Sequence, residues 1–347
     1  MEVDFLLIGQ GLAGSALAFR MLEEGVSFKI IDLPNENKSS RVAAGLYNPI
    51  TGKKMVKTWM GDQLFPVIKP FYRRIEKLLG EEFLFETPIY RPFLSIEEQN
   101  EWMGYSSMPD MAPFCKEIHI KSIFPEINDP LGGVMLQQCG YLDINTFLDA
   151  FTHYLLQKDY LIQERFEEDK LNVSENEVHY ENIKARGIVY CNGLGAAKST
   201  YFSHLPFAPV KGEILDLEED FTPDLIINRG VFRITLANGN VRVGSTYSWH
   251  DMDLGPTSRG KLELFEKLDK LMLADKKEVV QHRYGIRPAT KDRRPFLGKH
   301  PEHESVYIFN GFGAKGVSLV PYFSQMMLDL LINANEPQKE VNIARYK

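Results

Sequence analysis

The chain has 347 residues, of which 44% are hydrophobic and 25% charged, and these fractions are typical of a folded globular protein with an ample core. Its formal net charge of −7 argues against nucleic-acid binding over the whole surface, although it leaves local basic patches open. Three cysteines without a CxxC spacing indicate neither a disulfide framework nor a metal site, and no apolar run reaches the roughly eighteen residues that span a bilayer.

The first thirty residues predict the start of a dinucleotide-binding fold. An apolar strand over Val3–Gly9 leads into Gly9-Gln10-Gly11-Leu12-Ala13-Gly14, which opens a helix over Leu12–Glu24. In this pattern Gly11 lets the backbone approach a pyrophosphate, and Gly14 lets the helix pack closely on the sheet. The N-terminal amides of the helix would point at the phosphates. The alternative interpretation is a tight strand–helix turn that binds no ligand.

A second strand, Phe28–Ile31, ends in Asp32. A carboxylate there can accept hydrogen bonds from both ribose hydroxyls and disfavours a 2′-phosphate, so it indicates FAD or NAD rather than NADP. The apolar N-terminus lacks the basic region of a signal peptide, and its glycines are explained by the nucleotide motif. We therefore expect a cytoplasmic protein.

Basic residues gather between Thr51 and Lys77. The segment contains seven basic residues and only two acidic ones, Asp62 and Glu76. A solvated helix-and-loop face is one interpretation, and a site for an anionic substrate or an RNA edge is the other. The basic residues are Lys53, Lys54, Lys57, Lys69, Arg73, Arg74 and Lys77.

The middle of the chain continues the alternation of strands and helices. The small residues of Arg41–Pro49 would allow close backbone approach to a ring, and Asp143 or Asn145 is a natural N-cap for a helix over Thr146–Gln157. A buried strand, Ala185–Cys191, runs into Asn192-Gly193, which resembles a second turn facing a phosphate or ribose. The other predicted elements are a helix over Phe65–Leu79, strands over Glu86–Ile96, Ile118–Phe124 and Tyr160–Phe166, and a hairpin around Ser174–Asn176.

An antiparallel region follows, and the chain then returns to a glycine-rich motif. The strands predicted over Gly230–Leu236 and Asn240–Thr246 flank Asn238-Gly239, a strong hairpin signal. Val306–Asn310 runs into Gly311–Gly316, where the redox ring of a flavin would end. Further elements are predicted over Val210–Leu217, Lys261–Leu273, Val279–Arg287 and Val317–Leu331.

These elements predict an α/β fold in which a Rossmann-type dinucleotide-binding domain is interrupted by a substrate domain of antiparallel β-sheet and helices. The first domain would comprise residues 1–85, 140–205 and 280–347, and the second residues 86–139 and 206–279.

The order of motifs resembles the D-amino acid oxidase superfamily of FAD-dependent oxidoreductases, in particular its glycine and sarcosine oxidase branch, over nearly the whole chain. Besides the opening motif with Asp32, the resemblance rests on Ala43-Ala44-Gly45, Gly140-Tyr141-Leu142, Cys191-Asn192-Gly193 and Pro209-Val210-Lys211-Gly212-Glu213. The C-terminal block carries it most strongly: Gly285-Ile286-Arg287-Pro288-Ala289-Thr290-Lys291-Asp292, Pro295-Phe296-Leu297-Gly298 and Gly311–Gly316.

The resemblance implies a role for each matching position. The ADP half of FAD would lie against Gly9, Gly11, Gly14 and Asp32, with Gly193 beside its adenosine end. The pyrophosphate and flavin would be lined by Ser40, Arg41, Ala44, Gly45 and Leu46. Backbone amides for the flavin N1/C2 edge would come from Gly313, Lys315, Gly316 and Val317. A helix N-terminus there would stabilise the negative charge that hydride arrival places on that edge, and the Lys315 side chain would either add charge or face solvent.

Arg287 is the main candidate for substrate binding. In a Gly-Ile-Arg-Pro turn at the end of a strand, its planar guanidinium can hold a carboxylate bidentately and so orient a substrate over flavin N5. An interdomain salt bridge is the alternative. Tyr247, Phe232 and Arg233 would either line the pocket or serve as ordinary sheet residues.

The predicted activity is oxidation of a C–N bond of an amino acid or small carboxylated amine, by hydride transfer to FAD, without a metal. Sarcosine oxidase relatives tether the flavin through a cysteine just before this turn, whereas this chain has His282-Arg283-Tyr284-Gly285, so FAD is expected to bind noncovalently. Two alternatives remain: FAD-dependent oxidation of the carboxymethylaminomethyl group of a tRNA uridine, and a non-catalytic FAD-binding protein. The sequence names neither the electron acceptor nor the oligomeric state.

Overall fold

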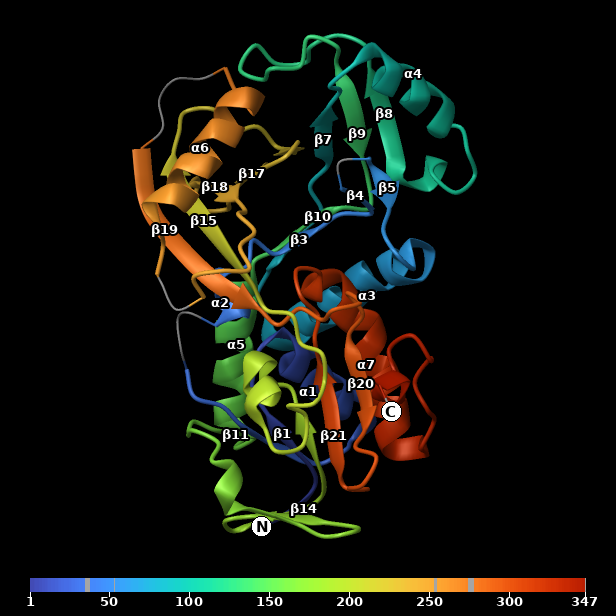
Figure 1. Ribbon diagram of the computed structural model, residues 1–347, viewed down its shortest axis with the longest axis vertical. Helices are drawn as coiled ribbons and strands as arrows, with labels where there is room; N and C mark the ends of the chain where they lie inside the picture. The colour runs from blue at the N-terminus through green and yellow to red at the C-terminus, as the bar shows by residue number, and fades with distance from the viewer. Residues whose placement is uncertain (35–37, 53, 253–254, 274–277, 347) are drawn as a thin grey trace.

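The computed structural model describes residues 1–34, 38–52, 54–252, 255–273 and 278–346. Two large sheets lie one above the other along the long axis of the molecule (Figure 1). The lower sheet contains β1 (Glu2–Ile8), near the N-terminus, and β21 (Val306–Asn310), which precedes the last long helix. The upper sheet contains the antiparallel region.

The lower sheet is built on five parallel strands in the order β11-β2-β1-β14-β21. An antiparallel strand, β20 (Phe296–Lys299), extends it beyond β21, and a hairpin pairs with the first half of β14. The parallel strands are β1 (Glu2–Ile8), β2 (Phe28–Ile31), β11 (Leu161–Ile162), β14 (Ile183–Tyr190) and β21 (Val306–Asn310), and the hairpin is β12 (Leu171–Val173) with β13 (Val178–Tyr180). This parallel order with helical crossovers is that of a doubly wound dinucleotide fold.

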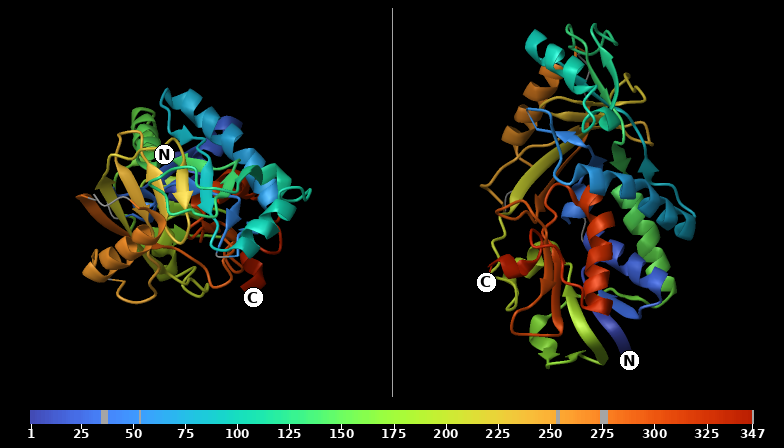
Figure 2. Two further views of the ribbon diagram at one scale, coloured as in Figure 1. Left: turned by 90° about the horizontal axis from the view of Figure 1, so that it is seen from above. Right: turned by 90° about the vertical axis from the view of Figure 1, so that its right-hand side faces the viewer.

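Four helices cover one face of the lower sheet, as Figure 2 shows from the side. They are α1 (Leu12–Glu24), α3 (Gly61–Leu79), α5 (Ile144–Gln157) and α7 (Gly316–Asn333). Arg20 of α1 donates to the Pro321 carbonyl of α7 at 3.0 Å and lies over the Phe71 ring of α3. The other face is covered by the segment after η3 (Gly193–Lys198) and by η4 (Ile343–Tyr346), where Phe202 and Ile343 are buried.

The upper sheet, which we call the platform, is antiparallel except where β16 pairs with β7. Its order is β19 (Glu278–Arg287), β15 (Val210–Glu218), β18 (Val241–Gly244), β17 (Phe232–Thr235), β16 (Ile226–Asn228), β7 (Ile89–Pro92), β9 (Gly133–Leu136) and β8 (Cys115–His119). Helix α6 (Ser258–Leu271) packs on its outer face through Leu264 and Leu268, against Leu215 and Leu217 of β15.

Short elements lie between the two halves. They are α2 (Ser39–Val42), a sheet of β3 (Leu46–Tyr47), β10 (Gly140–Leu142) and β6 (Leu84–Phe85), and the hairpin of β4 (Ile50–Thr51) and β5 (Val56–Lys57). Helix α4 (Ile96–Tyr105) and η1 (Ala112–Phe114) accompany the platform, and η2 (Glu168–Lys170) precedes β12 of the lower sheet. Helix α2 packs on β19, because a Cβ at Gly285 would lie 3.1 Å from Val42 Cβ. The end of β19 therefore meets the lower half of the molecule.

The predicted α/β fold class is confirmed, and so are the helix Leu12–Glu24, the Asn238-Gly239 hairpin and Asp143 as the N-cap of α5. The strand predicted over Glu86–Ile96 is wrong in its second half, because Ile96 begins α4. Ser95 Oγ accepts from the Glu98 amide at 3.2 Å, and Glu98 accepts from the Leu94 amide, so Ser95-x-x-Glu98 is a capping signal that the strand prediction overlooked. The other strand, predicted over Ile118–Phe124, ends at His119.

The predicted domain boundary at residue 280 falls inside β19, which pairs with β15 from Glu278 to Arg287. The division into two domains stays a prediction. Among the described residues, no helix combines the length and the apolar character required to cross a membrane.

Candidate functional site

The turn from β1 into α1 has the geometry expected for a phosphate-binding turn. Gly9 has a φ of +98°, and its amide donates to the Ile31 carbonyl at 2.9 Å. A Cβ at Gly14 would lie 1.9 Å from the Gly9 carbonyl oxygen, so this position requires glycine. At Gly11, by contrast, the nearest described atom to an added Cβ would be Ser40 Oγ at 3.1 Å. Gly11 therefore leaves space open at the N-terminus of the helix, whereas Gly14 allows the helix to pack directly against the Gly9 carbonyl.

Helix α1 has Gly11 as its N-cap residue, without a side-chain cap and without an acidic residue in its first turn. The free backbone N–H groups of its first turn thus carry a partial positive charge that no side chain of the helix neutralises. The Leu12 amide donates to Ser40 Oγ at 3.3 Å, which places Ser40 at the turn. Its contact with the cofactor stays a prediction.

Asp32 lies at the end of β2, where its amide donates to the Ile162 carbonyl at 3.1 Å. Its carboxylate is paired with Lys38. Asn192 packs against the same turn, since a Cβ at Gly9 would lie 2.7 Å from Asn192 Cα. Asn192 Oδ1 is buried and has no hydrogen-bond partner among the described residues. Gly193, with a φ of +56°, accepts a hydrogen bond from Asn310 Nδ2 at 3.0 Å.

The segment after α2 carries the next predicted contacts. Arg41 pairs with Asp149 at 2.5 Å, and its carbonyl accepts from Asn145 Nδ2. Gly45 has a φ of +74°, and a Cβ there would lie 1.9 Å from the Leu142 carbonyl oxygen, so it requires glycine. Ala44 precedes it, and Leu46 pairs with Tyr141 in the small sheet between the two halves.

The C-terminal glycine motif lies beside the N-terminal one. A Cβ at Gly316 would lie 3.2 Å from Leu12 Cδ1, so the first turns of α7 and α1 are neighbours. Gly313 has a φ of +55°, and its amide donates to the Pro288 carbonyl at 3.2 Å. Helix α7, like α1, has no side-chain cap and no acid in its first turn, where Val317 is buried. Two uncapped helix N-termini therefore meet at one place in the fold.

Lys315 is the N-cap residue of α7. Its Nζ donates to Thr58 Oγ1 at 3.4 Å, although the residue as a whole is exposed. Partial burial of the ammonium, followed by the like charges of Arg294 and Arg293, lowers the pKa of Lys315. The lysine thus belongs to a positively charged edge of the site.

Arg287 is the last residue of β19, and the arrow of this strand ends beside the lower half of the molecule (Figure 1). Its Nη2 donates to Ser245 Oγ at 2.7 Å and its Nη1 to the Thr246 carbonyl at 3.4 Å. The Tyr247 ring centroid lies 4.5 Å from the guanidinium carbon. A Cβ at Gly212 would lie 2.0 Å from Nη2, so the guanidinium lies directly on a strand that has no side chain there.

Among the described residues, no carboxylate forms a salt bridge with Arg287, so the interdomain salt bridge considered from the sequence does not form there. Burial lowers the pKa of Arg287, but a guanidinium stays protonated at any physiological pH. The half-buried arginine therefore carries a charge that uncharged groups hold in place.

Phe232 faces the same side of the platform as Gly244, since a Cβ at Gly244 would lie 2.7 Å from Phe232 Cζ. The suggestion that Arg233 lines a pocket is wrong. Arg233 is fully buried, pairs with Glu219 at 2.7 Å, and lies over the Phe221 ring, because strand alternation turns it to the opposite face.

These residues fit a bound dinucleotide such as FAD. Two uncapped helix ends offer amides, the glycine turns need their glycines for geometry, and the buried Asn192 Oδ1 lacks a partner beside the phosphate turn. Sequence reasoning included Asn192 in a motif without giving it a role. It missed Ser245 and Thr246, because no local pattern shows which strand Arg287 will contact.

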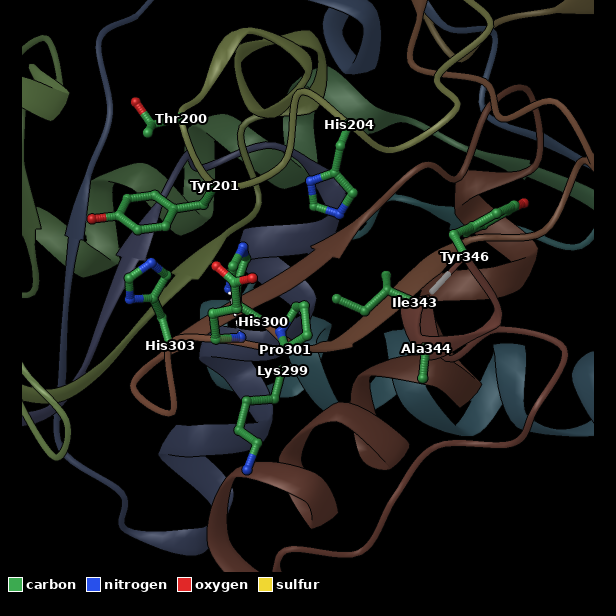
Figure 3. A pocket seen from close by; sticks show the side chains of 11 residues that line it. Thr200, Tyr201, His204, Lys299, His300, Pro301, His303, Ile343, Ala344 and Tyr346 are labelled. Atoms are coloured by element: carbon green, nitrogen blue, oxygen red, sulfur yellow. Dashed lines mark hydrogen bonds between the residues drawn. The ribbon is translucent and has the colours of Figure 1, made fainter.

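The described residues also line a cavity of about 450 Å³ away from this site (Figure 3). It lies at the ends of β20 and β21 remote from the glycine motif and contains His204, His300 and His303, with Tyr201 nearby. Burial, followed by His303 and His204, lowers the pKa of His300. None of the predicted site residues lines this cavity.

A family model described as FAD dependent oxidoreductase matches residues 4–330. Glycine oxidase of Pseudomonas putida is 33% identical over 136 residues, which are 38% of this chain and only 36% of that protein. The bifunctional tRNA 5-methylaminomethyl-2-thiouridine biosynthesis protein of Burkholderia mallei is 29% identical over 124 residues, 33% of this chain and 19% of that protein. The structure of iminodiacetate oxidase from Chelativorans sp. superposes with a TM-score of 0.79, covering 99% of this chain and 98% of that one at 21% identity.

Proposed function

The chain belongs to the FAD dependent oxidoreductase family, and from that premise we propose that it oxidises the C–N bond of an amino acid or small carboxylated amine. The observation that carries the proposal is Arg287, a guanidinium held by Ser245, Thr246 and Tyr247 and left without a carboxylate partner among the described residues. A substrate carboxylate is the natural bidentate partner of such a group.

Bound FAD supplies the hydride-accepting chemistry. In the substrate, the Cα–H bond breaks as hydrogen and its electron pair leave as hydride, the amine proton passes to solvent, and a C=N bond forms. The protein's own contribution is orientation. Arg287 would fix the carboxylate, and the uncapped ends of α1 and α7 would hold the anionic parts of the cofactor.

Activation of a neutral amine requires no acid–base residue, and the role we give Tyr247, whose ring lies beside Arg287, is to hold the guanidinium. Ser245 and the Thr246 carbonyl are uncharged, so they leave the guanidinium charge available to the substrate. The iminodiacetate oxidase neighbour and the glycine oxidase relatives bear names of enzymes whose substrates combine an amine with a carboxylate, which supports this substrate class.

The test is anaerobic mixing of the purified holoprotein with glycine, sarcosine, iminodiacetate, proline and alanine of both configurations. We expect at least one of them to bleach the flavin absorbance, while acids without an amine leave it unchanged. If no amine in the panel bleached a flavin that dithionite reduces normally, the proposal would fail.

A second candidate function is oxidation of a carboxymethylaminomethyl group on a tRNA uridine, which the partial similarity to the tRNA biosynthesis protein favours. The basic segment does not add support, because four of its cations pair with acids: Lys57 with Asp62, Lys69 with Glu86, Arg73 with Glu76, and Arg74 with Glu23. Bleaching by tRNA that carries this group, with none by the free amino acids, would favour the second candidate.

A further inference from the structure

Arg91, on β7 of the platform, is a second arginine that no carboxylate pairs with among the described residues. It is only 4% exposed, and its Nε is buried without a hydrogen-bond partner. Burial, followed by the like charge of Arg229, lowers the pKa of Arg91 to about 10. Since an unpaired guanidinium is costly to remove from water, the contacts that hold this one in place are informative.

The contacts of Arg91 lie in the hairpin of β4 and β5, which Figure 1 shows between the platform and α3. Nη1 donates to the Ile50 carbonyl at 2.9 Å, and Nη2 donates to the Gly52 carbonyl at 3.0 Å. The planar guanidinium can hold two carbonyls at once, in a geometry that a lysine ammonium does not reproduce. Arg91 therefore fixes the start of the hairpin to the platform.

The end of the same hairpin places the Thr58 hydroxyl. The Thr58 amide donates to the Pro49 carbonyl at 2.7 Å, and Thr58 Oγ1 donates to the Asn48 carbonyl at 3.3 Å. Thr58 Oγ1 also lies 3.3 Å from Thr51 Oγ1, and the residue is buried. The position of this hydroxyl thus depends on the hairpin that Arg91 holds.

The hydroxyl in turn holds Lys315, whose Nζ donates to Thr58 Oγ1 at 3.4 Å. Lys315 is the N-cap residue of α7, the helix whose first amides would face bound FAD. A long lysine side chain has many rotamers, so a single uncharged partner can decide where its charge lies. The next residue, Trp59, stacks on Phe323 of α7 with ring centroids 5.9 Å apart, which keeps the end of the hairpin against that helix.

We propose that Arg91 is a positioning residue for the redox site: by holding the β4–β5 hairpin it holds the Thr58 hydroxyl, and through that hydroxyl it holds the Lys315 ammonium at the start of α7. The attraction between two charges weakens with distance, so a lysine that leaves this place stabilises the reduced, more negative flavin less. The inference concerns the reduction potential of bound FAD and does not depend on which amine the protein oxidises.

The test measures the midpoint potential of FAD in the holoprotein by spectroelectrochemical titration, with flavin content and thermal melting as checks on folding. Arg91→Lys keeps the positive charge and removes the planar fork, so it separates position from charge. We expect it to lower the potential by about 20 mV, a roughly fivefold shift of the two-electron equilibrium. Arg186→Lys, at an arginine whose side chain is 64% exposed on β14, is the matched control and should leave the potential unchanged.

The same substitution in a Lys315→Met background shows whether Arg91 acts through the lysine. We expect Arg91→Lys to add nothing to the shift that Lys315→Met causes by itself. An equal lowering in both backgrounds would overturn the proposal, because Arg91 would then influence the flavin without Lys315. A potential that Arg91→Lys leaves unchanged would overturn it as well.

Thr58→Val tests the last link and serves if Arg91→Lys does not fold. It keeps the branched shape of the side chain and removes the hydroxyl that accepts from Lys315. We expect a lowering similar to that of Arg91→Lys, and none in the Lys315→Met background, whereas a normal potential in Thr58→Val would contradict the proposal. The proposed function fails by a different observation, the lack of bleaching by the amine panel, since these titrations use no substrate.

Discussion

The guanidinium of Arg287 is held by a hydroxyl, a backbone carbonyl and an aromatic ring, so its position is fixed, and no carboxylate among the residues that the structure describes pairs with its charge. An anionic partner supplied from solution would therefore meet a prepared group and lose little conformational entropy on binding. The residue type and the Gly-Ile-Arg-Pro turn led to Arg287 as the candidate carboxylate anchor, and that role stays a prediction. Its supports come from β15 and the segment after β18, and no local pattern in the sequence predicts such long-range contacts.

Lys315 gives a prediction at the same scale. Its pKa is lowered by partial burial and by Arg294 and Arg293, so it is part of a locally positive edge at the start of α7. Removal of one positive charge should disfavour the reduced, more negative flavin. Lys315→Met should lower the midpoint potential of bound FAD by about 30 mV, which is tenfold in a two-electron equilibrium.

Spectroelectrochemical titration measures this potential, with Lys339→Met, at an exposed lysine near the C-terminus, as the control. A potential in Lys315→Met that matched the control would mean that the lysine side chain only faces solvent. That was the alternative left open by the sequence.

At the scale of elements, the β1–α1–β2 unit was the most predictable part of the chain, because its glycines, helix and terminal acid follow one another within about thirty residues of sequence. Helix α4 was missed although Ser95 and Glu98 carry its capping signal. The residues before it have the composition of a strand, and β7 does pair in the platform, so the strand prediction was extended too far.

The two glycines of the first turn should respond differently to substitution. Gly11→Val should fold but lose FAD, because the side chain would occupy the cleared entrance to α1 and meets only Ser40 Oγ nearby. Gly14→Ala should destabilise the protein itself, because its Cβ would lie 1.9 Å from the Gly9 carbonyl oxygen. Thermal melting of the intact variants measures their stability. Absorbance of the supernatant after acid precipitation measures their flavin content, and the two measurements together distinguish the outcomes.

Normal flavin content in a folded Gly11→Val variant would contradict the assignment of this turn. The same precipitation tests the expected noncovalent attachment in the unmodified protein. Colour that remained in the pellet would show a covalent bond that the His282–Gly285 stretch does not predict.

At the scale of the whole molecule, the proposed site is shared between the two large sheets. The lower sheet contributes the phosphate turn and the start of α7, and the platform contributes Arg287 and Tyr247. Contacts that join the halves include Arg91 Nη1 with the Ile50 carbonyl at 2.9 Å and α2 packed on β19. The sequence order of the motifs predicted this sharing. The eight-strand platform could not be assembled from it, since β7 pairs with β16 far along the chain, and β9 and β8 follow β7 in the sheet.

The central claim is that Arg287 binds the carboxylate of an amine substrate in a FAD-dependent oxidation. The most direct measurement is kcat/KM, for the unmodified protein and Arg287→Ala, with a carboxylated amine and with an uncharged amine of similar size. The account predicts intact folding and FAD content, a loss of about two to three powers of ten for the carboxylated amine, and a much smaller loss for the uncharged one. Equal losses for the two amines would contradict it and would give Arg287 a purely structural role.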